Sequence, residues 1–170
     1  MVYNNNSLGE LTPKSYCTIS ESLEHGPPAI WCHLQPVLSD LPNAIDTLHF
    51  LSDGPATQYK NKTMFYILGS KIKVLFPNLA KFTWNYFESG RGNGAADGIG
   101  AVCKRTADRC VAQGKDVASF DTLFTVLTEN CPKVHIYKIF DHSMREFESK
   151  LNKEYIKPYI STMKVHQVSH

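Results

Sequence analysis

Residues 82–110 read FTWNYFESGRGNGAADGIGAVCKRTADRC and contain the pattern that decides the fold. The first part, FTWNYFE (82–88), mixes aromatic and polar residues in alternation and predicts a β-strand. Glycines at alternate positions then break the strand. Beyond them, buried positions recur every three or four residues, which predicts a helix with the core stripe Ile99, Val102, Cys103, Thr106, Ala107 and Cys110. The stretch therefore predicts a strand, a glycine-rich connection and an amphipathic helix that stops at Gly114.

Strands and helices alternate in both directions from this stretch. Upstream, the sequence predicts a strand over 15–20 (SYCTIS), a helix from Pro27, a buried strand over 48–54 (LHFLSDG) and a helix over 57–69; downstream, it predicts a helix over 117–127, a strand over 134–140 (VHIYKIF) and a helix from a capping box at Ser143 and Glu146 to about Tyr155. Pro36 is expected to kink the first helix or to end it early. This order predicts an α/β fold with a largely parallel sheet.

The composition is that of an ordinary globular chain. Of its 170 residues, 42% are hydrophobic and 20% are charged, which excludes a disordered, collagen-like or coiled-coil chain. Because no internal repeat or linker-like stretch interrupts the sequence, we expect a single domain over residues 15–170, after a flexible N-terminal segment over 1–14. The net charge of +2 does not by itself indicate a nucleic acid or a membrane as partner.

Neither a membrane segment nor an oxidised cysteine framework is predicted. No apolar run approaches the roughly 18 residues of a membrane span, and the N-terminal residues MVYNNNSLGE lack the features of an export signal. The chain has five cysteines, which is an odd number, and no two of them have CxxC spacing. This argues against a disulfide framework or a zinc ribbon. We therefore expect an intracellular protein, nuclear or cytoplasmic, with buried reduced thiols; metal or redox use of the thiols is the alternative.

The glycines after the aromatic strand do not form a nucleotide-binding loop. Gly90, Gly92 and Gly94 fit no GxGxxG frame, because the position three residues after Gly94 is Asp97, whose carboxylate would repel a pyrophosphate. The Walker pattern, the GxSxG elbow and the HExxH helix are also missing from the sequence. We therefore expect neither a nucleotide cofactor nor serine-hydrolase chemistry.

Two aspartates follow predicted strands where ligands bind in open α/β folds. Asp53 ends an apolar strand, and Asp97 begins the helix of the glycine-rich stretch. Two converging carboxylates could bind Mg²⁺ or Mn²⁺ and support in-line attack on a phosphodiester. Alternatively, both residues only cap helices. On an ideal helix Asp97 lies nearly opposite the core stripe, which counts against the metal site unless Gly98 and Gly100 delay the regular helix.

Four blocks of this sequence, taken together, resemble a group of transposon-derived proteins common in invertebrate genomes. The blocks are LSDGPATQYKNK (51–62), WNYFE (84–88), GNGAADGIGAVCKRTAD (92–108) and STMKVHQV (161–168), and the similarity covers about residues 15–168. The resemblance implies a ribonuclease-H-like mixed sheet flanked by helices, of the DDE transposase and integrase type. It also implies catalytic carboxylates on the first strand, on the fourth strand and on the helix after the fifth.

Carried over by motif, the resemblance makes Asp53 the fourth-strand acid and Asp97 the helix acid. Glu21, which follows the strand SYCTIS, is a third candidate, with a solvated turn as the alternative. The chain departs from the group in two ways. The group's Gly-His-Gly-Lys-Gly is here Gly-Arg-Gly-Asn-Gly (90–94), and the acid before SYCTIS is Glu10 rather than an aspartate. We therefore expect a first strand that carries the aspartate, and its hairpin partner, to be missing, as in a fragment or a truncated descendant of a longer transposase.

These departures favour a domain that has lost catalysis and binds a nucleic acid, such as DNA, or a protein partner. The expected phosphate contacts are Lys60, Lys62, Arg91, Lys104 and Arg105, which alternatively form only a solvated face. An active Mg²⁺- or Mn²⁺-dependent nuclease that uses Asp53 and Asp97 is a second hypothesis. A third is an effector scaffold anchored by Trp31 or by the aromatic residues 84–87, although we expect those rings to lie in the core.

Overall fold

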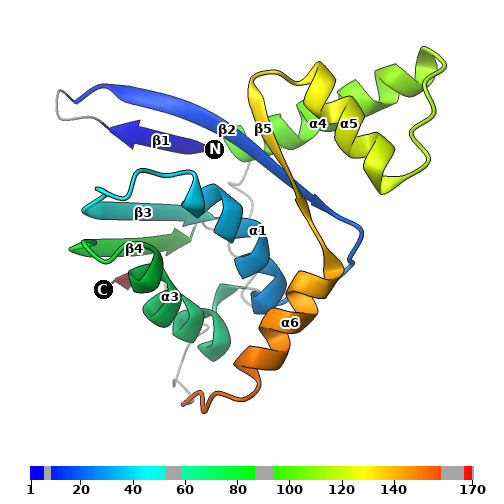
Figure 1. The fold of residues 1–170 in the computed structure, drawn as a ribbon. Helices are drawn as coiled ribbons and strands as arrows, with labels where there is room; N and C mark the ends of the chain where they lie inside the picture. The colour runs from blue at the N-terminus through cyan, green and yellow to red at the C-terminus, as the bar shows by residue number, and fades with distance from the viewer. Residues whose placement is uncertain (6–8, 53–58, 87–93, 158–166, 170) are drawn as a thin grey trace. The chain divides into compact units, whose positions relative to one another are not determined.

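The computed structural model describes residues 1–5, 9–52, 59–86, 94–157 and 167–169. These residues form a mixed α/β structure with two small sheets (Figure 1). Internal contacts divide the chain into two compact units. Unit 1 consists of Met1–Ser22 and Asn93–Asp141, and unit 2 consists of Leu23–Gly92 and His142–His170. The sequence predicted one domain over 15–170; in the structure each of the two units has a sheet of its own.

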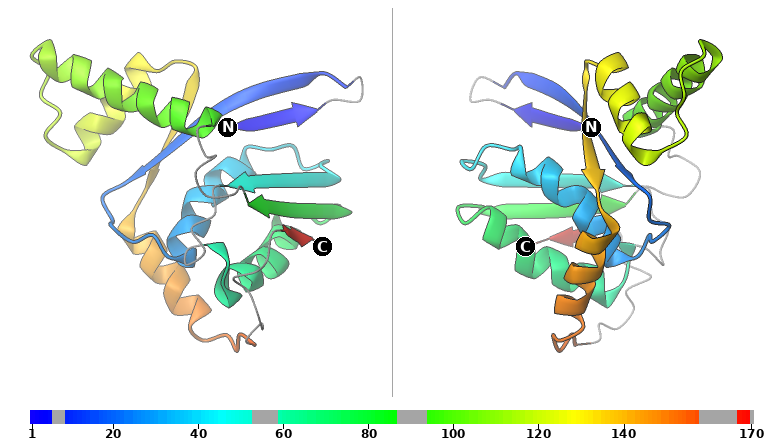
Figure 2. Two further views of the ribbon diagram at one scale, coloured as in Figure 1. Left: turned by 180° about the vertical axis from the view of Figure 1, so that it is seen from behind. Right: turned by 45° about the vertical axis from the view of Figure 1, so that its right-hand side comes forward.

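Unit 1 is a three-stranded mixed sheet with two helices. Its elements are β1 (Val2–Asn5), β2 (Leu11–Ser20), α4 (Ala95–Ala112), α5 (Phe120–Asn130) and β5 (Val134–Ile139). β2 pairs antiparallel with β1 and parallel with β5. α4 packs on β2, α5 packs on β5, and the two helices contact one another (Figure 2). Their shared core contains Ile99, Cys103, Leu127 and Cys131, with apolar side chains of β2 and β5 packed against it.

Residues 1–14, for which the sequence predicted a flexible segment, contain β1 and the first part of β2 in the structure. The two strands pair antiparallel, with Tyr3 opposite Pro13 and Asn5 opposite Leu11. Tyr3 and Leu11 are both exposed. Because this hairpin buries no continuous apolar face, its sequence lacks the alternation by which a strand is usually detected.

Unit 2 has a second three-stranded mixed sheet. Its elements are α1 (Pro27–Ser39), β3 (Thr47–Ser52), α3 (Lys62–Leu75), β4 (Lys81–Tyr86), β6 (Gln167–Ser169) and α6 (Asp141–Leu151), whose first residue counts with unit 1. β4 lies between β3, with which it is parallel, and β6, with which it is antiparallel. α3 is therefore the crossover helix of a β3–α3–β4 unit, and its buried residues Met64, Ile67, Leu68 and Ile72 are fully enclosed.

The predicted helices and strands are present, with several corrections. The sheets each combine one parallel and one antiparallel pair, so the expected largely parallel sheet is wrong. β3 is not a buried strand: its residues alternate between exposed and half-buried, and Leu51 is 62% exposed. α1 continues through Pro36 to Ser39, so the proline does not end the helix early as the sequence predicted.

Two further differences concern helix ends and faces. α6 begins at Asp141, so the capping box predicted at Ser143 is wrong. α4 ends as predicted, with Gly114 in the left-handed conformation at φ 85°. Along α4 the predicted stripe is buried or half-buried except at Val102, which is 42% exposed. Residues 53–54 and 87–88 of the predicted strands lie outside the described residues.

Candidate functional site

The carboxyl edge of β3 and β4 in unit 2 brings together the lysines of the block 51–62. We use the name carboxyl edge for Ser52, Tyr86 and the residues Tyr59–Lys62 at the start of α3. Because β3 and β4 are parallel, the crossover helix must begin at the end of the sheet where both strands finish. Ligands of open α/β sheets bind at this edge. Lys60 and Lys62 therefore lie at this edge, and their role as phosphate contacts stays a prediction.

The start of α3 is fixed by an asparagine cap between the two lysines. The side-chain carbonyl of Asn61 accepts a hydrogen bond from the backbone N–H of Met64 at 2.9 Å. The first turn of α3 contains no acidic residue. Lys60 and Lys62 thus flank the positive end of the helix dipole, where an anion is favoured. No carboxylate among the described residues forms an ion pair with either ammonium group.

Tyr86 contacts the chain just before α3 in two ways. Its hydroxyl donates a hydrogen bond to the carbonyl oxygen of Tyr59 at 3.3 Å. The Nζ atom of Lys60 lies 5.0 Å from the centroid of its ring, within cation–π distance. Burial raises the pKa of Tyr86 to about 12, with a smaller contribution from Tyr59. The phenol therefore stays protonated and remains a hydrogen-bond donor at neutral pH.

A stack of aromatic rings supports the carboxyl edge from inside. The ring of Trp84 stacks with that of Phe50 at 4.7 Å and with that of Tyr86 at 6.3 Å. Its Nε1–H donates to the hydroxyl of Ser52 at 2.8 Å, which ties the last residue of β3 to β4. Trp84 and Trp31 are both buried. The expectation that these rings belong to the core is confirmed, and neither forms the surface anchor of the effector hypothesis.

The opposite face of the same sheet carries a polar network that the sequence motifs did not reveal. His49 Nδ1 lies 2.7 Å from Thr83 Oγ1, and Asn85 Nδ2 donates to the same hydroxyl at 3.1 Å. Gln167 Nε2 donates to Asn85 Oδ1 at 2.8 Å, so the network connects all three strands. The available signal was the alternation of polar residues along β3 and β4, but the pairing with β6 could not be read from it.

In unit 1, Asp97 serves the start of α4. Its Oδ2 atom accepts a hydrogen bond from the backbone N–H of Gly94 at 3.2 Å, as in a capping box. α4 is helical from Ala95, so Gly98 and Gly100 do not delay the helix. Asp97 is exposed, as expected for a residue nearly opposite the core stripe. This arrangement is the capping role that the sequence left open for Asp97.

The other predicted residues fall into three groups. Glu21, Lys104 and Arg105 belong to unit 1 and are exposed, Glu21 after the end of β2 and the two cations along α4. Lys60 and Lys62 belong to unit 2. Asp53 and Arg91 lie outside the described residues. The pairing of Asp53 with Asp97 therefore stays a prediction, as does the Mg²⁺ or Mn²⁺ site built on it.

No metal-binding group of three or more His, Cys, Asp or Glu side chains occurs in the part of the chain that the structure describes. Of the two expected ligands, that part contains only Asp97, whose carboxylate is used by the helix cap. We therefore derive no metal-dependent step from the structure. Among the described helices, none is both long enough and apolar enough to cross a membrane.

The five cysteines are free thiols, and all except the half-buried Cys17 are buried. Cys17 on β2, Cys103 on α4 and Cys131 directly after α5 pack together in the core of unit 1. Burial, followed by the neighbouring Cys17 and Cys131, raises the pKa of Cys103 to about 12. Burial also raises the pKa of Cys17. The expectation of buried thiols is thus confirmed for Cys32, Cys103, Cys110 and Cys131, whereas Cys17 is only half-buried.

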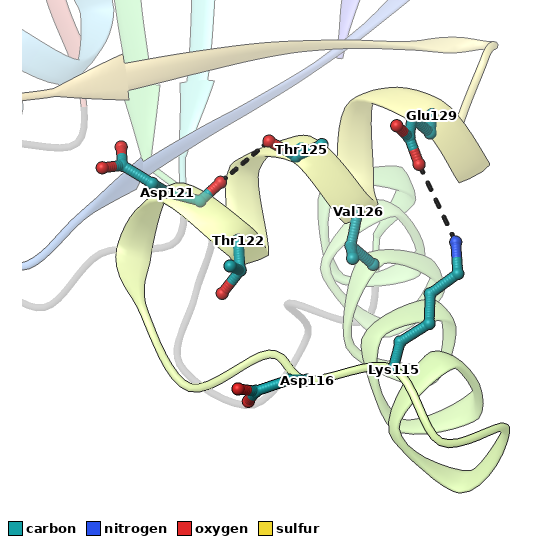
Figure 3. Close-up of a pocket in the computed structure, with 7 residues that line it drawn as sticks. All are labelled: Lys115, Asp116, Asp121, Thr122, Thr125, Val126 and Glu129. Atoms are coloured by element: carbon teal, nitrogen blue, oxygen red, sulfur yellow. Dashed lines mark hydrogen bonds and ion pairs between the residues drawn. The ribbon is translucent and has the colours of Figure 1, made fainter.

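An open pocket of about 410 Å³ lies between α5 and the connection that precedes it in unit 1. Its lining residues are Lys115, Asp116, Asp121, Thr122, Thr125, Val126 and Glu129 (Figure 3). Glu129 pairs with Lys115 at 3.8 Å, on the side of the pocket away from Asp116 and Asp121. Since the carboxylates do not converge and no residue predicted from the sequence lines the pocket, it is not the candidate site.

Comparison with known proteins gives one match. A family model described as a domain of unknown function (DUF8701) matches residues 1–170, the whole of this chain. No curated protein and no solved structure shows a significant match.

Proposed function

The chain belongs to the DUF8701 family, and we propose that it is a transposase-derived, ribonuclease-H-like domain that no longer cleaves phosphodiesters and binds DNA. The observation that carries this proposal is the carboxyl edge of β3 and β4. There, Lys60 and Lys62 flank the start of α3 without a described carboxylate to neutralise them. Cations in such a position contact phosphate groups and give affinity without sequence selectivity.

The loss of catalysis is supported by the state of the predicted carboxylates. Asp97 accepts the N–H of Gly94, which is sufficient reason for an aspartate at this helix start. The strands β1 and β2 contain no aspartate, and Arg91 and Asn93 replace the histidine and lysine of the resembling group. The antiparallel β1–β2 hairpin and the parallel β3–α3–β4 unit are compatible with a ribonuclease-H-like ancestry.

The test is the salt dependence of DNA binding by the full chain. A fluorescently labelled DNA duplex is titrated at about 50 to 200 mM salt, and we expect the logarithm of the association constant to fall linearly with the logarithm of salt concentration. In the double variant Lys60→Gln/Lys62→Gln, the slope should become shallower by about 2, because each phosphate contact contributes about 0.9. Fluorescence anisotropy measures both quantities.

Lys73→Gln is the matched control. Lys73 is also an exposed lysine of α3, but it lies in the last turn, at the other end of the helix. Its substitution removes one positive charge, as each single variant Lys60→Gln or Lys62→Gln does, and should leave the slope nearly unchanged, whereas each of those single variants should make it shallower by about 0.9. Failure of the wild-type protein to bind at the lowest salt would reject the proposal. Metal-dependent plasmid nicking that is lost in both Asp53→Ala and Asp97→Ala would show instead that the nuclease hypothesis is correct.

A further inference from the structure

Tyr86 is the one described residue at the carboxyl edge whose side chain contacts two successive residues before α3. Its hydroxyl is bonded to the carbonyl oxygen of Tyr59, and its ring lies under the ammonium group of Lys60. These two contacts constrain the backbone at residue 59 and the side-chain end at residue 60. Lys62, on the other side of the cap, is exposed and has no aromatic contact among the described residues.

We infer that Tyr86 is a positioning residue that holds the Lys60 ammonium at the carboxyl edge for a phosphate group of DNA. This inference rests on the proposed function. A lysine side chain in water samples many rotamers, and ordering it on binding reduces the affinity. A ring that already restricts the ammonium removes part of that cost. The ammonium can keep its ring contact while its remaining N–H groups face a phosphate oxygen.

The ring itself is well fixed. Tyr86 is 9% exposed, stacks with Trp84 at 6.3 Å and lies on β4, the central strand of the sheet. Because the pKa of its phenol is raised to about 12, the ring carries no negative charge at neutral pH, and its hydroxyl keeps donating to Tyr59. Lys60 is therefore held by a neutral ring, and no carboxylate of the residues that the structure describes competes with the phosphate for its charge.

A double-mutant cycle on DNA affinity tests the inference. Tyr86→Leu removes both contacts, and we expect the affinity for DNA to weaken by about threefold to tenfold. This loss corresponds to one cation–π contact together with the cost of ordering one lysine side chain on binding. The same substitution should weaken binding equally in the Lys62→Gln background. In the Lys60→Gln background it should have almost no further effect, because the residue that it positions is already removed.

Tyr86→Phe controls for damage to the core. It keeps the ring under Lys60 and removes only the hydrogen bond to Tyr59, so its affinity should lie between those of the wild type and Tyr86→Leu. Thermal unfolding of each variant shows whether it is folded at the temperature of the titration. Equal losses for Tyr86→Leu in the Lys60→Gln and Lys62→Gln backgrounds would indicate a purely structural role and would overturn the inference.

A measurement without DNA separates this inference from the proposed function. In the wild type, the ε-methylene protons of Lys60 should show an upfield ring-current shift in the NMR spectrum, retained in Tyr86→Phe and lost in Tyr86→Leu. Absence of this shift in the wild type overturns the positioning role even if DNA binds. Presence of the shift together with failure of the wild type to bind DNA rejects the proposed function, and with it the phosphate role of Lys60.

Discussion

Cys103 shows how its surroundings set the chemistry of one side chain. It lies on α4 within the core of unit 1, where Cys17 and Cys131 are its polarizable neighbours. Burial in this core disfavours the thiolate, so the pKa rises to about 12 from an ordinary value of 9.0. Since the thiolate is the nucleophile, Cys103 should be unreactive at neutral pH.

We therefore predict that iodoacetamide at pH 8 modifies Cys103 far more slowly in the folded protein than in urea. Cys17, which is only half-buried, should be modified earlier than Cys103. Peptide mass spectrometry at successive times measures both rates, and the urea sample is the control for intrinsic reactivity. Similar rates for Cys103 in folded and unfolded protein would contradict its placement in the core.

The same pKa shift predicts how stability depends on pH. Below pH 9.0 the thiol is protonated in both the folded and the unfolded protein, so the stabilisation that results from keeping it neutral is fully present. As the pH rises from 9.0 toward about 12, the unfolded chain loses this proton first, and the free energy of unfolding should fall. Urea midpoints across this range, compared with those of Cys103→Ala, test the sign.

At the scale of single elements, two glycines provide a matched pair. Gly69 lies within α3 with ordinary helical dihedrals, whereas Gly114 follows α4 with φ 85°. At both positions a Cβ atom would meet nothing within 4 Å. Substitution by alanine therefore changes only the conformational preference of the backbone.

Gly69→Ala should raise the free energy of unfolding by about 0.5–1 kcal/mol, because alanine restricts the unfolded chain and favours the helix. Gly114→Ala should lower it by about 1–2 kcal/mol, because the left-handed conformation crowds a Cβ atom. Urea unfolding followed by circular dichroism measures both changes. Changes of the same sign in both variants would contradict a helical Gly69 and a left-handed Gly114.

The elements differ in how well their sequences predict them. α4 is predicted because Ile99, Cys103 and Cys110 repeat at helical spacing and are buried in the structure. The β1 strand is not, because its exposed residues carry no apolar alternation. β3 contains an apolar run that suggested burial, yet alternate residues are exposed. Periodicity reports the face that an element buries, and it gives little information where a strand lies at an edge.

The candidate site could be predicted only in part for the same reason. Lys60 and Lys62 follow a predicted strand within one short block, so chain connectivity alone places them at its carboxyl end. The contact of Lys60 with Tyr86 depends on the pairing of β3 with β4, which brings together residues far apart in the sequence. The predicted pairing of Asp53 with Asp97 depends on how residues of two different units are placed. The sequence gives no information on this placement, because it predicted a single domain.

At the scale of the whole molecule, the division into two units predicts which unit a core substitution destabilises. Leu127→Ala in unit 1 and Ile67→Ala in unit 2 each remove a buried side chain and should cost about 2–5 kcal/mol. Because Leu127 packs in the core of unit 1 and Ile67 is buried on α3 of unit 2, amide hydrogen exchange should rise first in the unit that carries the substitution. Exchange measured by mass spectrometry resolves the two sets of peptides.

The exposed valines Val111 in unit 1 and Val74 in unit 2 supply the controls. Val111→Ala and Val74→Ala should each change stability by no more than about 0.5 kcal/mol and leave exchange unaltered. An equal rise of exchange in both units after Leu127→Ala would show that the chain unfolds as one cooperative structure. The division by contacts would then have no counterpart in stability.

The chain passes between the units three times, after Ser22, after Gly92 and after Asp141. As a ribosome releases this polypeptide, β2 emerges before the β3–α3–β4 crossover, while its parallel neighbour β5 follows only after both strands of that crossover have been made. The edge of β2 that pairs with β5 therefore stays unpaired until β5 has been synthesised. A stop codon anywhere before β5 yields a product in which both units are incomplete. Expression trials should keep the chain intact, because no uninterrupted piece of it corresponds to either unit.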